Sequence, residues 1–152
     1  MIQYVTGDAT TPIGSGCKII AHITNNQGGW GGDSGFVRAL SRKWKMPEQV
    51  YRYNEIDHVL GCNQYVEVEP DLWVANMCAQ DGYRSQKKPV AVNYYALAVC
   101  LEKLSARALA YRASVHCPRI GCGLGGGDWP TVAEILERVL VANGVPVTVY
   151  DF

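Results

Sequence analysis

The residues of this chain most suited to chemistry are the glycines of two short stretches, Gly28 to Gly32 (GGWGG) and Gly121 to Gly127 (GCGLGGG). Glycine adopts positive φ and lets a ligand approach main-chain N–H groups without meeting a Cβ atom. Where such N–H groups lie beside the N-terminus of a helix they bind phosphate, because the helix dipole is positive there. Two loops of this kind suit a diphosphate. A purely structural turn is the alternative for either loop.

Each glycine loop is predicted to connect a buried strand to a helix. Residues 18–23 form an apolar run before the first loop, and apolar residues at helical spacing follow it from Phe36 to Trp44. Residues 114–120 indicate a short strand before the second loop, and residues 132–140 indicate a helix after it. Asn25 and Asn26 end the first of these strands, and polar amides at the carboxyl end of a central strand point toward a ligand crevice.

The remaining patterns complete an α/β fold. Strands are expected at residues 2–5, 65–69, 72–79 and 145–152, a short helix at 48–54 and a long amphipathic helix at 94–108. The polar segment Gln80 to Lys88 indicates a flexible loop able to cover a ligand. Strands interleaved with helices around one hairpin predict a mixed central sheet between two layers of helices.

Composition limits the function classes. The 152 residues suit one domain, 1–152, and 48% of them are apolar. Fourteen basic and fourteen acidic residues cancel, so no overall field attracts nucleic acid or an anionic membrane. No signal sequence or long apolar run is present, and we expect a soluble, cytoplasmic monomer.

Six cysteines raise the question of a disulfide or a metal site. None of them forms a Cys-x-x-Cys motif, which favours reduced, buried thiols and no metal or cofactor. Cys122 differs because it lies inside the second glycine loop, where a helix N-terminus could lower its pKa. We favour packing over catalysis for Cys122, since its possible partners, His22 and His116, are not placed by the sequence.

Three classes of phosphate site can be compared with the second loop. A nucleoside triphosphatase is excluded, because neither glycine loop ends in Gly-Lys-Ser/Thr. Gly121-x-Gly123-x-x-Gly126 matches the dinucleotide fingerprint, and Asp151 follows at about the distance of a ribose-binding acid. The predicted helix, however, starts several residues after the last glycine, and the strands that should follow in a dinucleotide fold are missing.

The third class fits better, because motifs along almost the whole chain resemble the macrodomain family. They are Gly7-Asp8, Ala21-His22, Asn25-Asn26, the GGWGG loop with Gly35-Phe36, PRIGCGL before Trp129, and the terminal Val147-Thr148-Val149-Tyr150. The likeness is strongest to the terminal ADP-ribose protein glycohydrolase and ADP-ribose 1″-phosphate phosphatase branch. It implies a three-layer α/β/α macrodomain fold with ADP-ribose in a crevice at the strand ends.

The resemblance also implies ligand contacts. Asp8 would accept a hydrogen bond from the adenine amino group, with a turn aspartate as the alternative. Asn25 and Asn26 would meet the distal ribose, because an amide both donates and accepts; a plain asparagine turn is the alternative. Tyr150 or Phe152 would line the adenine pocket, and core packing is the alternative for both. The remaining expected ligand contacts are Ala9, Gly29, Trp30, Gly31, Gly32, Gly35, Phe36, Ile120, Gly121, Cys122, Gly123, Leu124 and Gly125.

The chain departs from this branch in two catalytic positions. A lysine and an aspartate of the glycohydrolases correspond to Gln80 and Gly125, so a covalent lysine route would need Lys87 or Lys88 to fold inward. We expect instead that the distal ribose is positioned for attack by water.

Residues at the distal ribose would carry that attack. Asn25 would position the ribose, and Asp33, Asp81 or Asp128 could steer the water, although Asp128 before Trp129-Pro130 is equally a helix N-cap. The catalytic candidates are Asn25, Asn26, Asp33, Gln80 and Asp128.

The function expected from the resemblance is hydrolysis of ADP-ribosyl esters. The substrates would be ADP-ribosylated acidic side chains of proteins or small O-acyl-ADP-ribose esters. A non-catalytic ADP-ribose reader and an ADP-ribose 1″-phosphate phosphatase are the alternatives.

Overall fold

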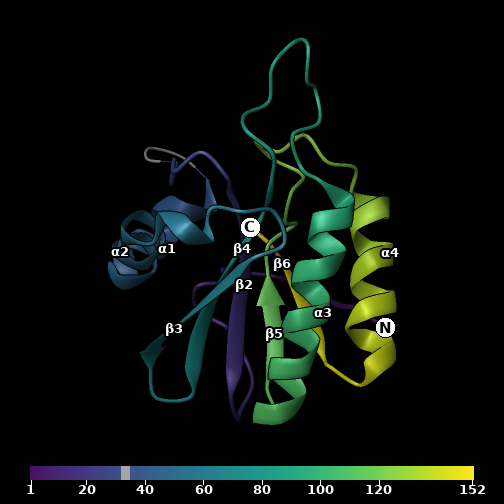
Figure 1. The fold of residues 1–152 in the computed structure, drawn as a ribbon. Coiled ribbons are helices and arrows are strands. Elements are labelled where there is room, and N and C mark those ends of the chain that lie inside the picture. The colour runs from purple at the N-terminus through teal and green to yellow at the C-terminus, as the bar shows by residue number, and fades with distance from the viewer. Residues whose placement is uncertain (32–34) are drawn as a thin grey trace.

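The computed structural model describes residues 1–31 and 35–152. Within these residues the chain forms one sheet and four α-helices (Figure 1). The strands are β1 (Gln3–Thr6), β2 (Lys18–Asn25), β3 (Asn63–Glu69), β4 (Leu72–Gln80), β5 (Ser114–Cys117) and β6 (Val147–Asp151). The helices are α1 (Phe36–Lys43), α2 (Met46–Tyr53), α3 (Tyr94–Tyr111) and α4 (Trp129–Val139), with short 3₁₀ turns η1 (Glu55–Asp57) and η2 (Val141–Asn143).

The sheet has six strands in the order β1-β6-β5-β2-β4-β3. All neighbouring strands are parallel except β3 and β4, which form the predicted hairpin. β2 lies inside the sheet between β5 and β4, which explains its nearly continuous apolar run. The mixed sheet expected from the sequence is confirmed.

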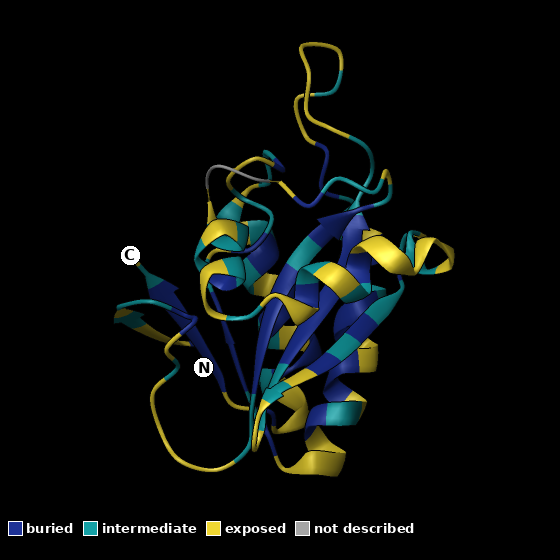
Figure 2. Cartoon of the chain, turned by 90° about the vertical axis from the view of Figure 1, so that its left-hand side faces the viewer, coloured by how far each residue is buried: buried dark blue, intermediate teal, exposed yellow. Residues whose placement is uncertain are grey.

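Helices cover both faces of this sheet, so the chain has three layers. Side chains of β2 alternate between two buried clusters: Ile19 and Ala21 pack with α3 and α4, and Ile20 packs with α1 and α2. Figure 1 shows the two helix pairs on opposite sides, and Figure 2 shows buried strands between them. The α/β/α architecture is confirmed.

Prolines set three element boundaries. β5 ends at Cys117, before Pro118, and β6 begins at Val147, after Pro146, so both strands are shorter than expected. Pro47 stands in the first turn of α2, where its missing N–H has no intrahelical partner to lose. It therefore starts a second helix directly after α1.

The parallel strands β2, β4 and β5 bring their carboxyl ends to one edge of the sheet. The chain leaves β2 toward α1 and β5 toward α4, so the space between these two strands is a switch point of the topology. Both glycine loops start at this edge, and the segment after β4 projects above it (Figure 1). In the described part of the chain, no helix has the length and apolarity needed to cross a bilayer.

Candidate functional site

A cavity of about 940 Å³ opens at the carboxyl ends of β2, β4 and β5. Its walls come from the first glycine loop, the first turn of α1, the segment after β4 and the second glycine loop. The cavity is the size of a typical small-molecule site. Its position agrees with the crevice expected at the strand ends.

The second glycine loop presents a run of free main-chain donors. The loop folds on itself, because Gly127 N donates to Gly121 O at 2.7 Å and Gly126 N donates to Gly123 O at 3.1 Å. Across the described residues, the N–H groups of residues 123–125 donate to no protein acceptor, and all three residues line the cavity. Successive free N–H groups of this kind form an anion site.

The helix dipole at this site comes from α1. We expected the helix after the second glycine loop to supply it, but Asp128 caps α4, its carboxylate accepting from Thr131 N at 3.1 Å and Thr131 Oγ1 at 2.7 Å. The N-cap alternative for Asp128 is thus confirmed, and Asp128 does not line the cavity. The N-cap of α1 is Gly35, which has φ 77° and no side chain to bond to the helix. The first turn of α1 lines the cavity, so the positive end of its dipole lies at the site.

Asn25 shapes the first glycine loop from within. Its Nδ2 donates to Gly29 O at 2.6 Å, and its Oδ1 accepts from Gln27 N at 2.8 Å and Gly29 N at 3.3 Å. The buried Tyr51 hydroxyl donates to Asn25 O at 2.7 Å and accepts from Gly28 N at 3.1 Å. The register between β2 and β4 shifts after Thr24, and a bulge of this kind re-aims the side chain that follows it. Asn25 lines the cavity while holding the loop.

Asn26 and Gln80 anchor the segment after β4. Asn26 donates to Asp81 Oδ1 at 3.1 Å and accepts from Gly82 N at 2.8 Å. Gln80 lines the cavity, and its Nε2 donates to Gly82 O at 3.0 Å. Lys88 pairs with Asp81 at 2.8 Å, and this pair, with the Asn26 bond, lowers the pKa of Asp81. Of these side chains only Gln80 reaches the cavity.

Residues 81–90 form a hairpin-like segment, here called the strap. Its tip is closed by reciprocal bonds between Ser85 and Lys88, at 2.8 and 3.1 Å. Further along, Ala91 N and Val92 N both donate to Gly125 O, at 2.8 and 3.1 Å. The base of the strap is therefore bonded to the second glycine loop. The segment lies at the ligand site as expected, but it is anchored at its base where a flexible loop was expected.

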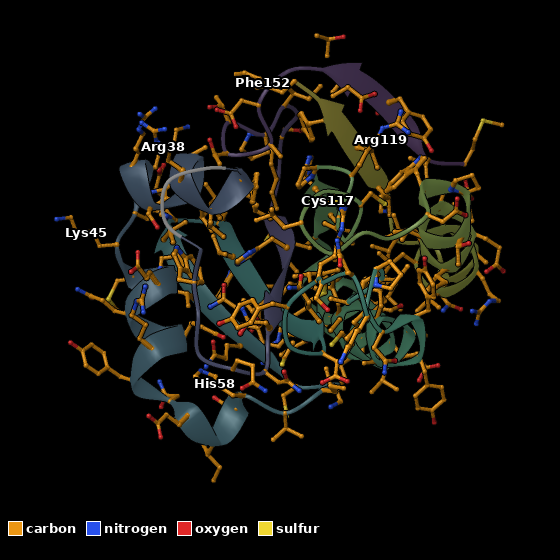
Figure 3. All side chains as sticks on the ribbon, turned by 90° about the horizontal axis from the view of Figure 1, so that it is seen from above. Arg38, Lys45, His58, Cys117, Arg119 and Phe152 are labelled. Carbon is orange, nitrogen blue, oxygen red and sulfur yellow. The ribbon has the colours of Figure 1, made fainter. Side chains whose placement is uncertain are left out.

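The charged groups that line the cavity are cationic. Among the described lining residues are Arg84 and Arg119 but no carboxylate. Arg119 is neutralised by Asp151, the last residue of β6, at 2.7 and 3.1 Å. Figure 3 shows where Arg119 lies. His22, at the cavity floor, is buried, and burial lowers its pKa to about 4. The imidazole is therefore neutral at pH 7.

The residues expected around adenine lie outside this cavity. Asp8 Oδ1 accepts from Thr10 N and Thr10 Oγ1, both at 2.8 Å, as a turn aspartate does, and the neighbouring Ala9 is buried. Tyr150 is buried, and its hydroxyl bonds to His116 Nδ1 at 2.7 Å. Phe152 is fully exposed at the chain end. These bonds are those of a turn aspartate at Asp8 and of a packed side chain at Tyr150, and the adenine contacts stay predictions.

Two predicted ligand contacts, Trp30 and Cys122, also pack within the fold, and their ligand contacts stay predictions. Trp30 lines the cavity, but its ring is buried against His22 and its Nε1 donates to Ser41 Oγ at 2.8 Å. Burial and, second, the nearby Asp128 raise the pKa of Cys122, which keeps the thiol protonated and supports packing over catalysis.

The remaining expected contacts divide into two groups. Gly32 and Asp33 lie outside the described residues. Those that line the cavity are Gly29, Gly31, Gly35, Phe36, Ile120, Gly121, Gly123, Leu124 and Gly125.

Tyr83 and Arg84 are cavity residues that the sequence reasoning did not single out. They are adjacent in the sequence, an aromatic residue followed by a cationic one within an otherwise polar loop, and this pattern could have indicated a ligand contact. Among the described residues, no group of three or more His, Cys, Asp or Glu side chains is arranged to hold a metal ion.

No family model matches the chain. The structure is similar to a macrodomain protein from Streptomyces coelicolor, with 45% sequence identity, 100% of this chain and 99% of that chain covered, and a TM-score of 0.87. ADP-ribose 1″-phosphate phosphatase from Candida albicans is 28% identical over 91% of this chain and 93% of that protein. Chromodomain-helicase-DNA-binding protein 1-like from Mus musculus is 27% identical over 99% of this chain, which spans only 18% of that protein.

Proposed function

The chain belongs to the macrodomain family, and on that premise we propose that it binds ADP-ribose in the cavity, with the diphosphate between the two glycine loops. The observation that carries this proposal is the row of free N–H groups at residues 123–125. Such donors meet an anion without needing a side chain. The first turn of α1, whose N-cap Gly35 has no side chain, adds the positive end of a helix dipole from another wall of the cavity.

The absence of carboxylates among the described lining residues favours the same ligand class. A nearby carboxylate would repel a diphosphate, and the described walls contain none, while they contain the cation Arg84 in addition to Arg119, which Asp151 neutralises. The distal ribose would then lie toward Gly29 and Gln80, where Asn25 sets the shape of the loop.

Hydrolysis of ADP-ribosyl esters is a second proposal. The similarity to ADP-ribose 1″-phosphate phosphatase over 93% of that protein's length favours an enzyme of the ADP-ribose class. Of the candidate acids, Asp81 and Asp128 do not line the cavity and Asp33 lies outside the described residues. The catalytic proposal therefore rests on the similarity to the phosphatase and on Asn25, which shapes the loop beside the expected distal ribose. Phosphatase activity on ADP-ribose 1″-phosphate is tested in the same assays.

Thermal unfolding with ADP-ribose, NADH and ATP tests the binding proposal. A ligand at about 100 times its Kd stabilises the folded state by about 2.7 kcal/mol, which raises the Tm of a chain of this size by roughly 5–10 °C. We expect this shift with ADP-ribose and a much smaller one with the other two nucleotides. Equal shifts for all three ligands would remove the proposal.

Turnover assays test the catalytic proposal. The substrates are ADP-ribosyl-glutamate, O-acetyl-ADP-ribose and ADP-ribose 1″-phosphate, and we expect release of ADP-ribose from the carboxylate esters. If the protein binds ADP-ribose but releases nothing from any of the three, it is a reader. If it acts on the 1″-phosphate alone, it is a phosphatase.

A further inference from the structure

Arg84 lies over the second glycine loop and is the cation of the described cavity wall that has no carboxylate partner. Its Nη1 donates to Gly123 O at 3.4 Å, which is a long bond. A guanidinium carries five N–H donors, and that bond occupies one of them. Arg119, the other lining arginine, is already paired with Asp151. Arg84 is therefore available to an anionic ligand in a way that Arg119 is not.

The donors of Arg84 and of the glycine loop converge on one place. Gly123, whose carbonyl Arg84 touches, begins the row of free N–H groups at residues 123–125. An anion held by these N–H groups would lie within reach of the guanidinium. Arginine binds phosphate oxygens through two parallel N–H bonds, which adds direction as well as charge.

The strap holds Arg84 at this place before any ligand arrives. Gly126, with φ 71°, allows Pro89 O to pass so close that a Cβ atom would collide with it. The pair Lys88–Asp81 and the bonds from Asn26 close the base of the strap. A side chain carried on a fixed backbone loses less entropy on binding than one carried on a mobile loop.

The neighbouring residue makes the strap a bridge across the cavity. The Tyr83 hydroxyl lies so near Gly29 that a Cβ atom there would collide with it. Tyr83 thus contacts the first glycine loop, and Arg84 contacts the second. A ligand that runs between the two loops would pass the strap at its diphosphate.

We propose that Arg84 is a ligand-binding residue of the site, binding the diphosphate of the ligand from the strap while the glycine loop binds it through main-chain N–H groups. The inference rests on the proposed binding of ADP-ribose. It assigns part of the affinity for the diphosphate to a side chain of the strap, in addition to the main-chain N–H groups of the glycine loop.

Calorimetric titration of ADP-ribose into Arg84→Gln and Lys87→Gln tests the inference. Both variants remove one positive charge from the strap, but Lys87 is exposed and does not line the cavity. We expect Arg84→Gln to bind at least tenfold more weakly than wild type at about 50 mM salt and to lose part of the salt dependence of Kd, because the lost contact is ionic. Lys87→Gln should stay within about twofold, since an exposed charge at a distance is screened. Arg84→Lys, which keeps the charge but not the fork, should fall between wild type and Arg84→Gln.

The outcomes separate the inference from the function on which it rests. If Arg84→Gln and Lys87→Gln weaken ADP-ribose binding equally, Arg84 acts only through its charge at a distance, and the inference is wrong. The inference is also wrong if Arg84→Gln binds ADP-ribose as tightly as wild type. If the wild-type protein does not bind ADP-ribose at all, the proposed function is wrong. An unchanged Tm for the exposed Arg84→Gln variant shows that the fold is intact.

Discussion

Asn25 is bonded to Gly29 through both of its side-chain polar atoms, Nδ2 donating to Gly29 O at 2.6 Å and Oδ1 accepting from Gly29 N at 3.3 Å. The resemblance to macrodomains implies that the Asn25 amide contacts the distal ribose, whereas in the structure both of its polar atoms already have a main-chain partner. The observed pairing makes Asn25 the residue that gives the first glycine loop its shape, through which it acts on any ligand in the cavity.

Asn25→Ala should therefore lower both stability and affinity, rather than turnover alone. The substitution leaves polar groups of Gly29 and Gln27 without partners, which costs about 1–3 kcal/mol. That corresponds to a Tm lower by roughly 2–10 °C. Thermal unfolding and ADP-ribose titration measure the two effects. A variant with wild-type Tm and affinity but reduced kcat would restore the catalytic role of the amide.

Substitutions at two glycines of the second loop should have opposite signatures. A Cβ at Gly123 meets no protein atom within 4 Å, so Gly123→Val should keep the wild-type Tm while its side chain crowds the ligand and abolishes binding. Gly126 has φ 71° and its Cβ would collide with Pro89 O, so Gly126→Ala should lower Tm. Unfolding and titration of both variants check this. Normal binding by Gly123→Val would make that glycine merely structural.

Gly31 of the first glycine loop is less suitable for this test. It has φ 95°, and a Cβ atom there would lie 3.0 Å from Val37 Cγ2, so its substitution also strains the fold.

Lys87→Ala and Lys88→Ala should both retain any ester hydrolysis. Lys88 is held by Asp81 at 2.8 Å, and neither lysine lines the cavity. A lysine nucleophile would form an imine that borohydride traps, so mass spectrometry after borohydride treatment with substrate should find no adduct. An adduct on either lysine, together with an inactive variant, would establish the covalent route.

Stability should fall as pH drops from about 6.5 toward 4. Burial lowers the pKa of His22 and of His116 from 6.5 to about 4, so the unfolded chain binds two protons in this window that the folded chain does not. The resulting slope is on the order of 2 kcal/mol per pH unit, with full stability above 6.5. Thermal unfolding across this range measures it, and His22→Gln should roughly halve the slope. A flat profile would mean that the folded and unfolded chains take up these protons at the same pH, so that neither pKa is lowered by the fold.

The sequence by itself determined the layers and the location of the site. The apolar run of β2 could be buried on both faces only inside a sheet, and the glycines could be tolerated at strand ends only as turns or ligand contacts. Near Pro47, Pro118 and Pro146 the observed element boundaries differ from the expected ones by a few residues. Proline lacks the N–H that a helix or strand needs, and apolar spacing alone does not show this.

Only the tertiary structure decided what each polar side chain does. The sequence left Asp128 as either a site acid or a helix N-cap, and the structure shows the cap on α4, while the first turn of α1 lines the cavity. Asn25 bonds to Gly29 while lining the cavity, and Arg84 lies over Gly123, 39 residues away in the chain. Periodicity reports which residues are buried, but a hydrogen bond depends on ångström-scale distances between segments remote in sequence, and only the packed fold sets those distances.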